Sequence, residues 1–277
     1  MNPDDGFSHI GVVGINLQYE KEAKAMKRYL FLLAAGWGLV THVLAQTNGP
    51  IRVDEDIFLI PLGDSVYIHE TWHETPQTGR FPSNGMIVIR NGEAVMIDTP
   101  MDNDKTERLT KYVDENLGAR VTLFIAGHFH DDNIGGLDYL HRIGVRSLAL
   151  DLTVKKCREL GLPVPVRSFS DSLLVPFNGE LLMCRFFGPG HSFDNITVWF
   201  PQRKILFGGC LIRSADAKGL GNLSDAVVEE WDTTLGKILK TYPDVRIVVP
   251  GHGACGGKEL LTHTVDLVRR HRNRNRE

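Results

Sequence analysis

The chain has 277 residues, 42% hydrophobic and 23% charged, which is enough to bury a sizeable core. Its formal net charge of −3 lacks the basic balance typical of nucleic-acid-binding proteins, so no nucleic-acid partner is expected. The basic run at residues 269–276 is interpreted as a solvated helix end and tail.

The N-terminal region carries the pattern of a secretory signal. From Met26 a positive start is followed by an apolar run at residues 29–43, and small or aliphatic residues precede a cleavage point after Ala45. The alternative, a membrane anchor, is disfavoured because the run is short and His42 interrupts it. We therefore expect a periplasmic protein with no membrane association after cleavage. The chain divides into an upstream extension outside the mature protein (1–25), a signal peptide (26–45) and a single domain (46–277).

The first half of the mature chain alternates predicted strands and helices. Alternating or apolar runs predict strands at residues 51–69, 86–90, 93–97, 121–126 and 146–150. The Asn91-Gly92 pair between two of these runs is a strong hairpin signal. Helical periodicity predicts helices at residues 102–117, 136–143 and 152–160. Residues 70–82 are polar and are expected to form a long loop or a hairpin tip.

The second half repeats this plan. Two hairpins are predicted at residues 173–187 and 195–207, and a strand at 245–249. Apolar stripes predict helices at residues 224–240 and 259–271. The hairpin–helix–strand pattern thus occurs twice, which indicates two facing sheets with helices outside.

Four segments share a layout in which an apolar strand is followed by glycine or proline and then by a ligand-type residue. Glycines let the backbone turn sharply, and ligand sites tend to gather at strand ends. With the carboxylate that follows the first segment, the candidate metal ligands are His128, His130, Asp132, His191, Cys210 and His252. Imidazoles, a thiolate and a carboxylate suit zinc better than calcium. Six ligands are too many for one tetrahedral ion, so we expect two zinc ions per chain, each with three protein ligands and an open position.

Export implies an oxidising compartment, where cysteines tend to pair. The chain has four cysteines, and the sequence does not say which of them pair, if any. Cys210 is interpreted as a metal ligand. For Cys255, three residues after His252, a structural or free thiol is expected rather than a metal ligand.

From about residue 54 to 270 the sequence resembles the metallo-β-lactamases, specifically their subclass B1. The segments that carry the resemblance are His-Phe-His-Asp-Asp at residues 128–132 and the segments at residues 97–100, 189–195, 206–210, 221–226 and 250–253. The Gly-Gly-Cys segment that ends at Cys210 narrows the likeness to this subclass. Other members of the superfamily commonly carry histidine where this chain has Asn133.

The resemblance implies an α/β fold, a four-layer αβ/βα sandwich of two facing mixed β-sheets with helices on the outer faces. It implies a first zinc held by His128, His130 and His191, and a second zinc held by Asp132, Cys210 and His252. Asp98 would support the ligands from behind. Residues 70–82 would form a flap over the substrate, with Trp72 near its tip.

The same resemblance implies a zinc-dependent hydrolase of small-molecule β-lactams that acts as a monomer. Asp132 would orient a zinc-bound hydroxide, and Asn222 would help to stabilise the oxyanion. Arg213 would bind the substrate carboxylate where the family often has lysine. The chain has no S-x-x-K motif, which excludes a serine β-lactamase. Two alternatives remain open: another hydrolase on the same scaffold, such as a lactonase, and an exported, non-catalytic zinc-binding protein.

Overall fold

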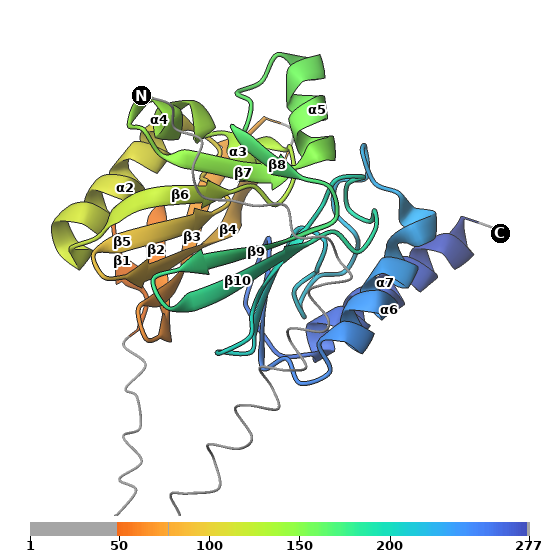
Figure 1. The fold of residues 1–277 in the computed structure, drawn as a ribbon. Helices are drawn as coiled ribbons and strands as arrows, with labels where there is room; N and C mark the ends of the chain where they lie inside the picture. The colour runs from red at the N-terminus through yellow and green to blue at the C-terminus, as the bar shows by residue number, and fades with distance from the viewer. Residues whose placement is uncertain (1–48, 77, 276–277) are drawn as a thin grey trace, which may run out of the picture. The chain divides into compact units, whose positions relative to one another are not determined.

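Two β-sheets form the centre of the fold (Figure 1). The computed structural model describes residues 49–76 and 78–275, so the predicted extension and signal peptide lie outside the described residues. The first sheet has the strand order β1 to β8, antiparallel from β1 to β5 and parallel from there to β8. Its strands are β1 (Ile51–Arg52), β2 (Ile57–Gly63), β3 (Val66–Thr75), β4 (Gly79–Arg90), β5 (Glu93–Ile97), β6 (Arg120–Ile125), β7 (Arg146–Leu150) and β8 (Arg167–Phe169).

The second sheet has the order β13-β12-β11-β10-β9, and only its β12–β13 pair is parallel. Its strands are β9 (Ser172–Phe177), β10 (Glu180–Arg185), β11 (Thr197–Phe200), β12 (Ile205–Gly209) and β13 (Ile247–Pro250). The helices are α2 (Asn103–Leu117), α3 (Asp131–Ile134), α4 (Leu137–Arg142), α5 (Asp151–Leu160), α6 (Val228–Thr241) and α7 (Glu259–Arg274). None of these described helices is both long and apolar enough to span a membrane.

Three apolar cores separate four layers. The first core packs α2, α4 and α5 against the first sheet, through residues such as Leu109 and Leu140. The second lies between the two sheets, and the third packs α6 and α7 against the second sheet around Trp231. Figure 1 shows these helices on the two outer sides of the paired sheets. The expected four-layer αβ/βα sandwich is confirmed.

Local sequence signals account for several element boundaries. Asn91 and Gly92 both adopt positive φ and join β4 to β5, as a two-residue hairpin turn requires. The side chain of Asp102 caps α2 by accepting the Lys105 amide, and Gly118 ends the helix in the left-handed conformation.

The structure decides between the two forms expected for residues 70–82 and corrects one helix boundary. Most of residues 70–82 belong to β3 and β4, which pair as far as Thr75 and Gly79, so the segment is the end of a hairpin and not a long loop. Helix α6 begins at Val228 instead of Ser224, because the preceding residues form turns in which the Ser224 amide donates to the side chain of Asn222.

Candidate metal centre

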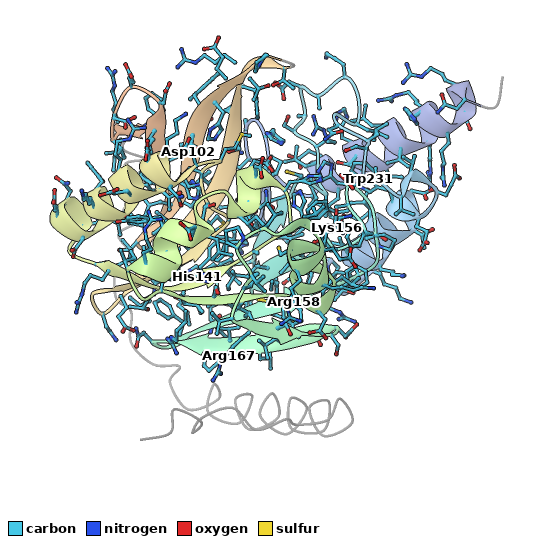
Figure 2. The ribbon with its side chains drawn as sticks, turned by 90° about the horizontal axis from the view of Figure 1, so that it is seen from above. Asp102, His141, Lys156, Arg158, Arg167 and Trp231 are labelled. Atoms are coloured by element: carbon cyan, nitrogen blue, oxygen red, sulfur yellow. The ribbon has the colours of Figure 1, made fainter. Side chains whose placement is uncertain are left out.

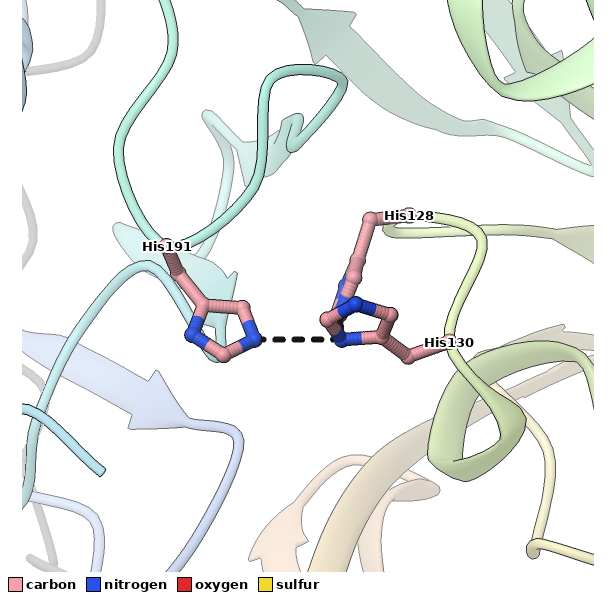
Figure 3. Close-up of side chains that lie close together, drawn as sticks. All are labelled: His128, His130 and His191. Atoms are coloured by element: carbon pink, nitrogen blue, oxygen red, sulfur yellow. Dashed lines mark hydrogen bonds between the residues drawn. The ribbon is translucent and has the colours of Figure 1, made fainter. Parts of the chain in front are cut away.

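The six ligand-type residues lie together at the end of the sandwich where strands from both sheets finish. The loop after β6 carries His128 and His130, and α3 carries Asp132. Cys210 directly follows β12, and His252 is two residues beyond β13. His191 comes from the connection between β10 and β11 and points toward the other two histidines (Figure 3).

Three imidazole nitrogens converge in a first triad. The Nδ1 atom of His130 lies 2.9 Å from Nε2 of His128 and 3.3 Å from Nε2 of His191. Tetrahedral zinc with bonds of about 2.0–2.1 Å places donor nitrogens roughly 3.3 Å apart. This triad therefore has the chemistry and spacing of a zinc-binding face.

A second triad combines three different donor atoms. Nε2 of His252 lies 3.2 Å from Oδ2 of Asp132 and 3.4 Å from Sγ of Cys210, and the sulfur and carboxylate atoms are 3.6 Å apart. The longer zinc–sulfur bond of about 2.3 Å widens the expected donor spacing to roughly 3.6 Å. Ligand atoms of His128, Asp132 and Cys210 also lie within 4.8 Å of one another, so the two triads adjoin.

The protonation states of these groups favour cation binding. Burial and neighbouring imidazoles lower the pKa of His128 well below its usual value and that of His191 to about 3, which leaves neutral rings with free lone pairs. Burial raises the pKa of Asp132, but hydrogen bonding and charge from His252 outweigh it and lower the pKa overall. Burial and the charge of Asp132 raise the pKa of the Cys210 thiol. A divalent cation reverses that last effect and holds the sulfur as thiolate.

Outer contacts orient two of the imidazoles. Nε2 of His130 is 3.0 Å from the carboxylate of Asp225, and Nδ1 of His252 is 2.7 Å from the carbonyl oxygen of Pro82. Partners of this kind fix the tautomer and direction of a metal-binding histidine. Sequence reasoning did not assign a role to either partner. The motif at residues 221–226 contained Asp225, but nothing in it pointed to His130.

Asn133, the residue after Asp132, is a neighbour of the second triad. Its side-chain amide donates to Oδ1 of Asp132 at 3.1 Å, and the residue is buried. Asn133 thereby holds Asp132 through Oδ1, while the other carboxylate oxygen, Oδ2, faces Cys210 and His252.

Asp98 lies against the loop that carries His128. Its Oδ1 accepts the Gly127 amide at 2.5 Å, and burial followed by the charge of Asp132 raises its pKa well above the usual range. Among the described residues its Oδ2 has no hydrogen-bond partner.

The guanidinium of Arg213 lies next to Gly221, the residue before Asn222. A Cβ built on Gly221 would lie 3.1 Å from Nη1 of Arg213, so the guanidinium packs against the residue before Asn222. Arg213 has no ion pair with a described carboxylate, and its Nε atom is buried without a partner. Burial lowers the pKa of Arg213, with Cys210 and Asp216 opposing that shift, although the group remains cationic. Asn222 is exposed.

Trp72 lies within a strand rather than near the tip of the hairpin. It pairs with Pro82, its indole N–H donates to Glu70, and the Arg80 guanidinium stacks over its ring at 5.2 Å. A depression of about 510 Å³ is lined by Glu55, Asp56, Trp72, His73, Glu74, Arg80 and Lys105. None of the six ligand-type residues lines this depression.

All four cysteines are free thiols in the described part of the chain. Cys157 and Cys184 are buried in the cores and Cys255 is half-buried. Burial raises the pKa of Cys184 to about 12 and that of Cys157 to about 11, so both are poor nucleophiles and poor ligands.

Comparisons with known proteins identify the family. The chain is 46% identical over 226 residues to a metallo-β-lactamase type 2 of Bacteroides fragilis, across 82% of this chain and 90% of that protein. It is 39% identical to the enzyme of the same name from Bacillus sp. (strain 170), across 82% of this chain and 86% of the relative. No family model matches the sequence.

Solved structures agree with these relatives. A metallo-β-lactamase from Pontibacter korlensis superposes with a TM-score of 0.74 at 35% identity, covering 77% of this chain and 99% of that one. The mono-zinc form of FIM-1 from Pseudomonas aeruginosa has the same TM-score at 27% identity, over 79% and 97% of the two chains.

A two-sheet sandwich with adjoining His/Asp/Cys triads at its strand ends is the architecture of a metal-dependent hydrolase. The chain belongs to the metallo-β-lactamases, and within them to subclass B1.

Proposed function

We propose that the protein is a two-zinc β-lactamase that opens the amide bond of penicillins, cephalosporins and carbapenems and so confers antibiotic resistance. The observation that carries the proposal is the pair of adjoining triads, whose donor atoms are 2.9–3.6 Å apart within each triad. Three protein ligands at each site leave a position for a reacting group, as catalytic rather than structural zinc sites do.

When bound, the zinc ions would supply a hydroxide nucleophile at neutral pH and Lewis-acid stabilisation of developing charge. The side chains of the protein position the nucleophile and the substrate. Asp132 accepts a hydrogen bond from the nucleophile and so orients it. The hydrogen bond from Asn133 and the contact with His252 hold its carboxylate in place. The side-chain amide of Asn222 donates to the oxyanion, a contribution of about 3–4 kcal/mol for donors of this type.

The charge of the substrate selects its orientation. The β-lactams named here carry a carboxylate next to the ring nitrogen, and Arg213 offers a guanidinium that lacks an ion pair with any described residue. A bidentate guanidinium–carboxylate contact is strong and directional. On the other side of the substrate, Trp72 of the β3–β4 hairpin provides an apolar surface for substrate binding.

The comparisons favour neither of the alternatives that the sequence left open, a lactonase and a non-catalytic zinc-binding protein. For the whole chain we propose export through the signal at residues 26–45, cleavage after Ala45, and a monomeric single domain at 46–277 in the periplasm. The support for this part is the charged start, the apolar run and the small residues before the cut.

The test is to express the full chain and purify the processed protein from the periplasm. We expect about two zinc ions per chain, hydrolysis of a chromogenic cephalosporin and of a carbapenem, and loss of both activities with a chelator. Cys210→Ala should lose most of the activity. Full activity of that variant, or a zinc-loaded wild type that opens no lactam, would contradict the proposal. A mass that includes residues before Gln46 would contradict the processing site.

A further inference from the structure

His69 is a buried histidine outside both triads. It lies in β3, is 1% exposed, and its Nε2 atom is 3.0 Å from the carbonyl oxygen of Asp98. Burial lowers its pKa to about 4, so the ring is neutral and donates from Nε2 to that carbonyl group. Its Nδ1 atom has no hydrogen-bond partner among the described residues. An unsatisfied buried polar atom costs about 1–3 kcal/mol, so fold stability alone does not account for a histidine at this position.

The imidazole reaches Asp98 by crossing a neighbouring strand. His69 pairs with Gly85 of β4, and a Cβ on Gly85 would lie 2.1 Å from Nε2 of His69 and 2.5 Å from the carbonyl oxygen of Ile97. Only glycine leaves room for the ring between β3 and the end of β5. The sequence thus provides both a donor and the space through which it acts.

Asp98 has the left-handed backbone that this contact supports. Its φ is 57°, a region that non-glycine residues occupy at a cost of about 1–3 kcal/mol unless their surroundings hold them. Its amide donates to the Ile125 carbonyl group at 3.0 Å, and His69 binds its carbonyl oxygen. The residue is therefore held at both ends of its own backbone.

The carboxyl group of Asp98 lies against both ligand-bearing loops. Cβ atoms built on Gly127 and Gly209 would lie 2.8 Å and 3.6 Å from its Oδ2 atom. These glycines directly precede His128 of the first triad and Cys210 of the second. A shift of Asp98 would consequently move the loops that carry ligands of both metals.

We propose that His69 is a positioning residue of the metal centre: it fixes the left-handed turn at Asp98 and through it the spacing of the His128 and Cys210 loops. The inference rests on the proposed metal site. It predicts that the hydrogen-bond donor of His69, rather than its bulk, is what the centre requires.

The decisive comparison is between His69→Gln and His69→Met, which have similar length but differ in the donor. Glutamine places an amide nitrogen close to the position of Nε2, whereas methionine offers none. We expect His69→Met to weaken zinc affinity by about 10-fold or more and His69→Gln to stay within about threefold of wild type. Affinity is measured on metal-free protein by competition with a chromophoric chelator, independently of turnover. Equal affinities of the methionine variant and wild type, or equal losses in both variants, would overturn the proposal.

His141→Met is the matched control. His141 is half-buried, its Nε2 atom lies 2.8 Å from the hydroxyl oxygen of Ser147, and it forms no hydrogen bond with any of the described ligand residues. Its zinc affinity should equal that of wild type, and a loss as large as that of His69→Met would count against a specific role. In case His69→Met does not fold, nitrogen NMR of the wild type gives a second reading. The Nε2–H tautomer of His69 supports the proposal and the Nδ1–H tautomer overturns it, whereas a wild type that binds no metal overturns the proposed function as well.

Discussion

At the scale of single residues, His130 and Asp225 form the clearest link between a ligand and its support. The carboxylate that bonds Nε2 of His130 also accepts the hydroxyl of Ser224 at 3.0 Å, so two donors fix it. Burial raises the pKa of Asp225, but its hydrogen bonds with His130 and Ser224 outweigh burial and lower that pKa overall. An ionised acceptor of this kind holds Nδ1 of His130 as the free lone pair that faces the first triad.

Removal of that acceptor should therefore weaken the first metal site. We expect Asp225→Ala to lower zinc affinity about 10–100-fold and Asp225→Asn, which keeps a carbonyl acceptor, to lose less. Titration of metal-free protein with zinc in the presence of a competing chelator measures both. If alanine and asparagine behave like wild type, the contact does not support the ligand.

Arg213 allows a separate prediction about substrate. It has no ion pair with a described residue, so removing its charge should cost little stability and mainly affect binding. Because a hydrogen bond to a charged group contributes about 1.5–3 kcal/mol, Arg213→Met should raise KM for a penicillin about 10–100-fold. Arg213→Lys should recover part of the loss. Steady-state kinetics and thermal unfolding on the same preparations check this, and an unchanged KM for Arg213→Met would exclude the contact.

At the scale of elements, the β3–β4 hairpin is joined to the loop that carries His252. The Asn84 amide N–H donates to Gly251, and its side chain donates to the carbonyl oxygens of Pro250 at 3.0 Å and Gly253 at 2.7 Å. The adjacent carbonyl group of Pro82 binds His252 itself. One strand of the first sheet thus positions a ligand that the second sheet supplies.

Asn84→Ala leaves two carbonyl groups without their donor, each worth about 1–3 kcal/mol when buried. We expect a lower melting temperature and a weaker second zinc site. Ser83→Ala is a control one residue away, since Ser83 bonds His73 and Thr71 rather than the His252 loop. Calorimetry with and without zinc measures the effect. A zinc-dependent rise in melting temperature as large in Asn84→Ala as in wild type would contradict the coupling.

The difference between local and tertiary contacts explains what the sequence could predict. Asn91-Gly92, Asp102 and Gly118 act within a few residues, so their turn and caps could be predicted from their own neighbourhood. Most of the ligand residues were visible because glycine or proline and then a ligand-type side chain follow an apolar run in each of four segments.

The contacts of His69, Asn84 and Asp225 join segments 29 to 169 residues apart, and no local pattern carries them. The start of α6 was missed because the turn at Asn222 depends on a side-chain bond that competes with helix formation. The extension of β3 and β4 through residues 70–82 depends on their pairing with each other, which polar composition obscures.

At the scale of the whole molecule, a charge cluster joins the two sheets at the end remote from the metal centre. Glu180 of β10 accepts hydrogen bonds from Arg90, at the far end of β4, and from Arg203, which also bonds Asp64 at 2.9 Å. The side chains of Glu180 and both arginines are at most 17% exposed. This cluster therefore connects the two sheets at one end, and the metal ligands connect them at the other.

Glu180→Ala would leave two arginines without their shared partner in a largely dry site. Breaking a buried pair from one side costs about 3–5 kcal/mol. Urea unfolding should show a loss of about that size, whereas zinc affinity and turnover per folded molecule should not change. The exposed pair Arg142–Asp138 provides the comparison, and Asp138→Ala should cost under about 1 kcal/mol. A loss of zinc affinity in Glu180→Ala would show that the two ends are coupled.

The order of the ligands along the chain determines when during folding the metal can bind. Residues 128 to 252 contribute to the centre from both sheets, so loops of many residues must close before a complete triad exists. A chain with one sheet formed can gather His128 and His130 but not Cys210 or His252. We therefore expect metal binding to be a late event in folding. The free energy of metal binding then stabilises only molecules in which both halves of the fold have assembled. If the chain is exported as proposed above, and exported unfolded, it would acquire its stability together with its metal after translocation, and scarcity of the proposed zinc there would lower the amount of folded protein as well as its activity.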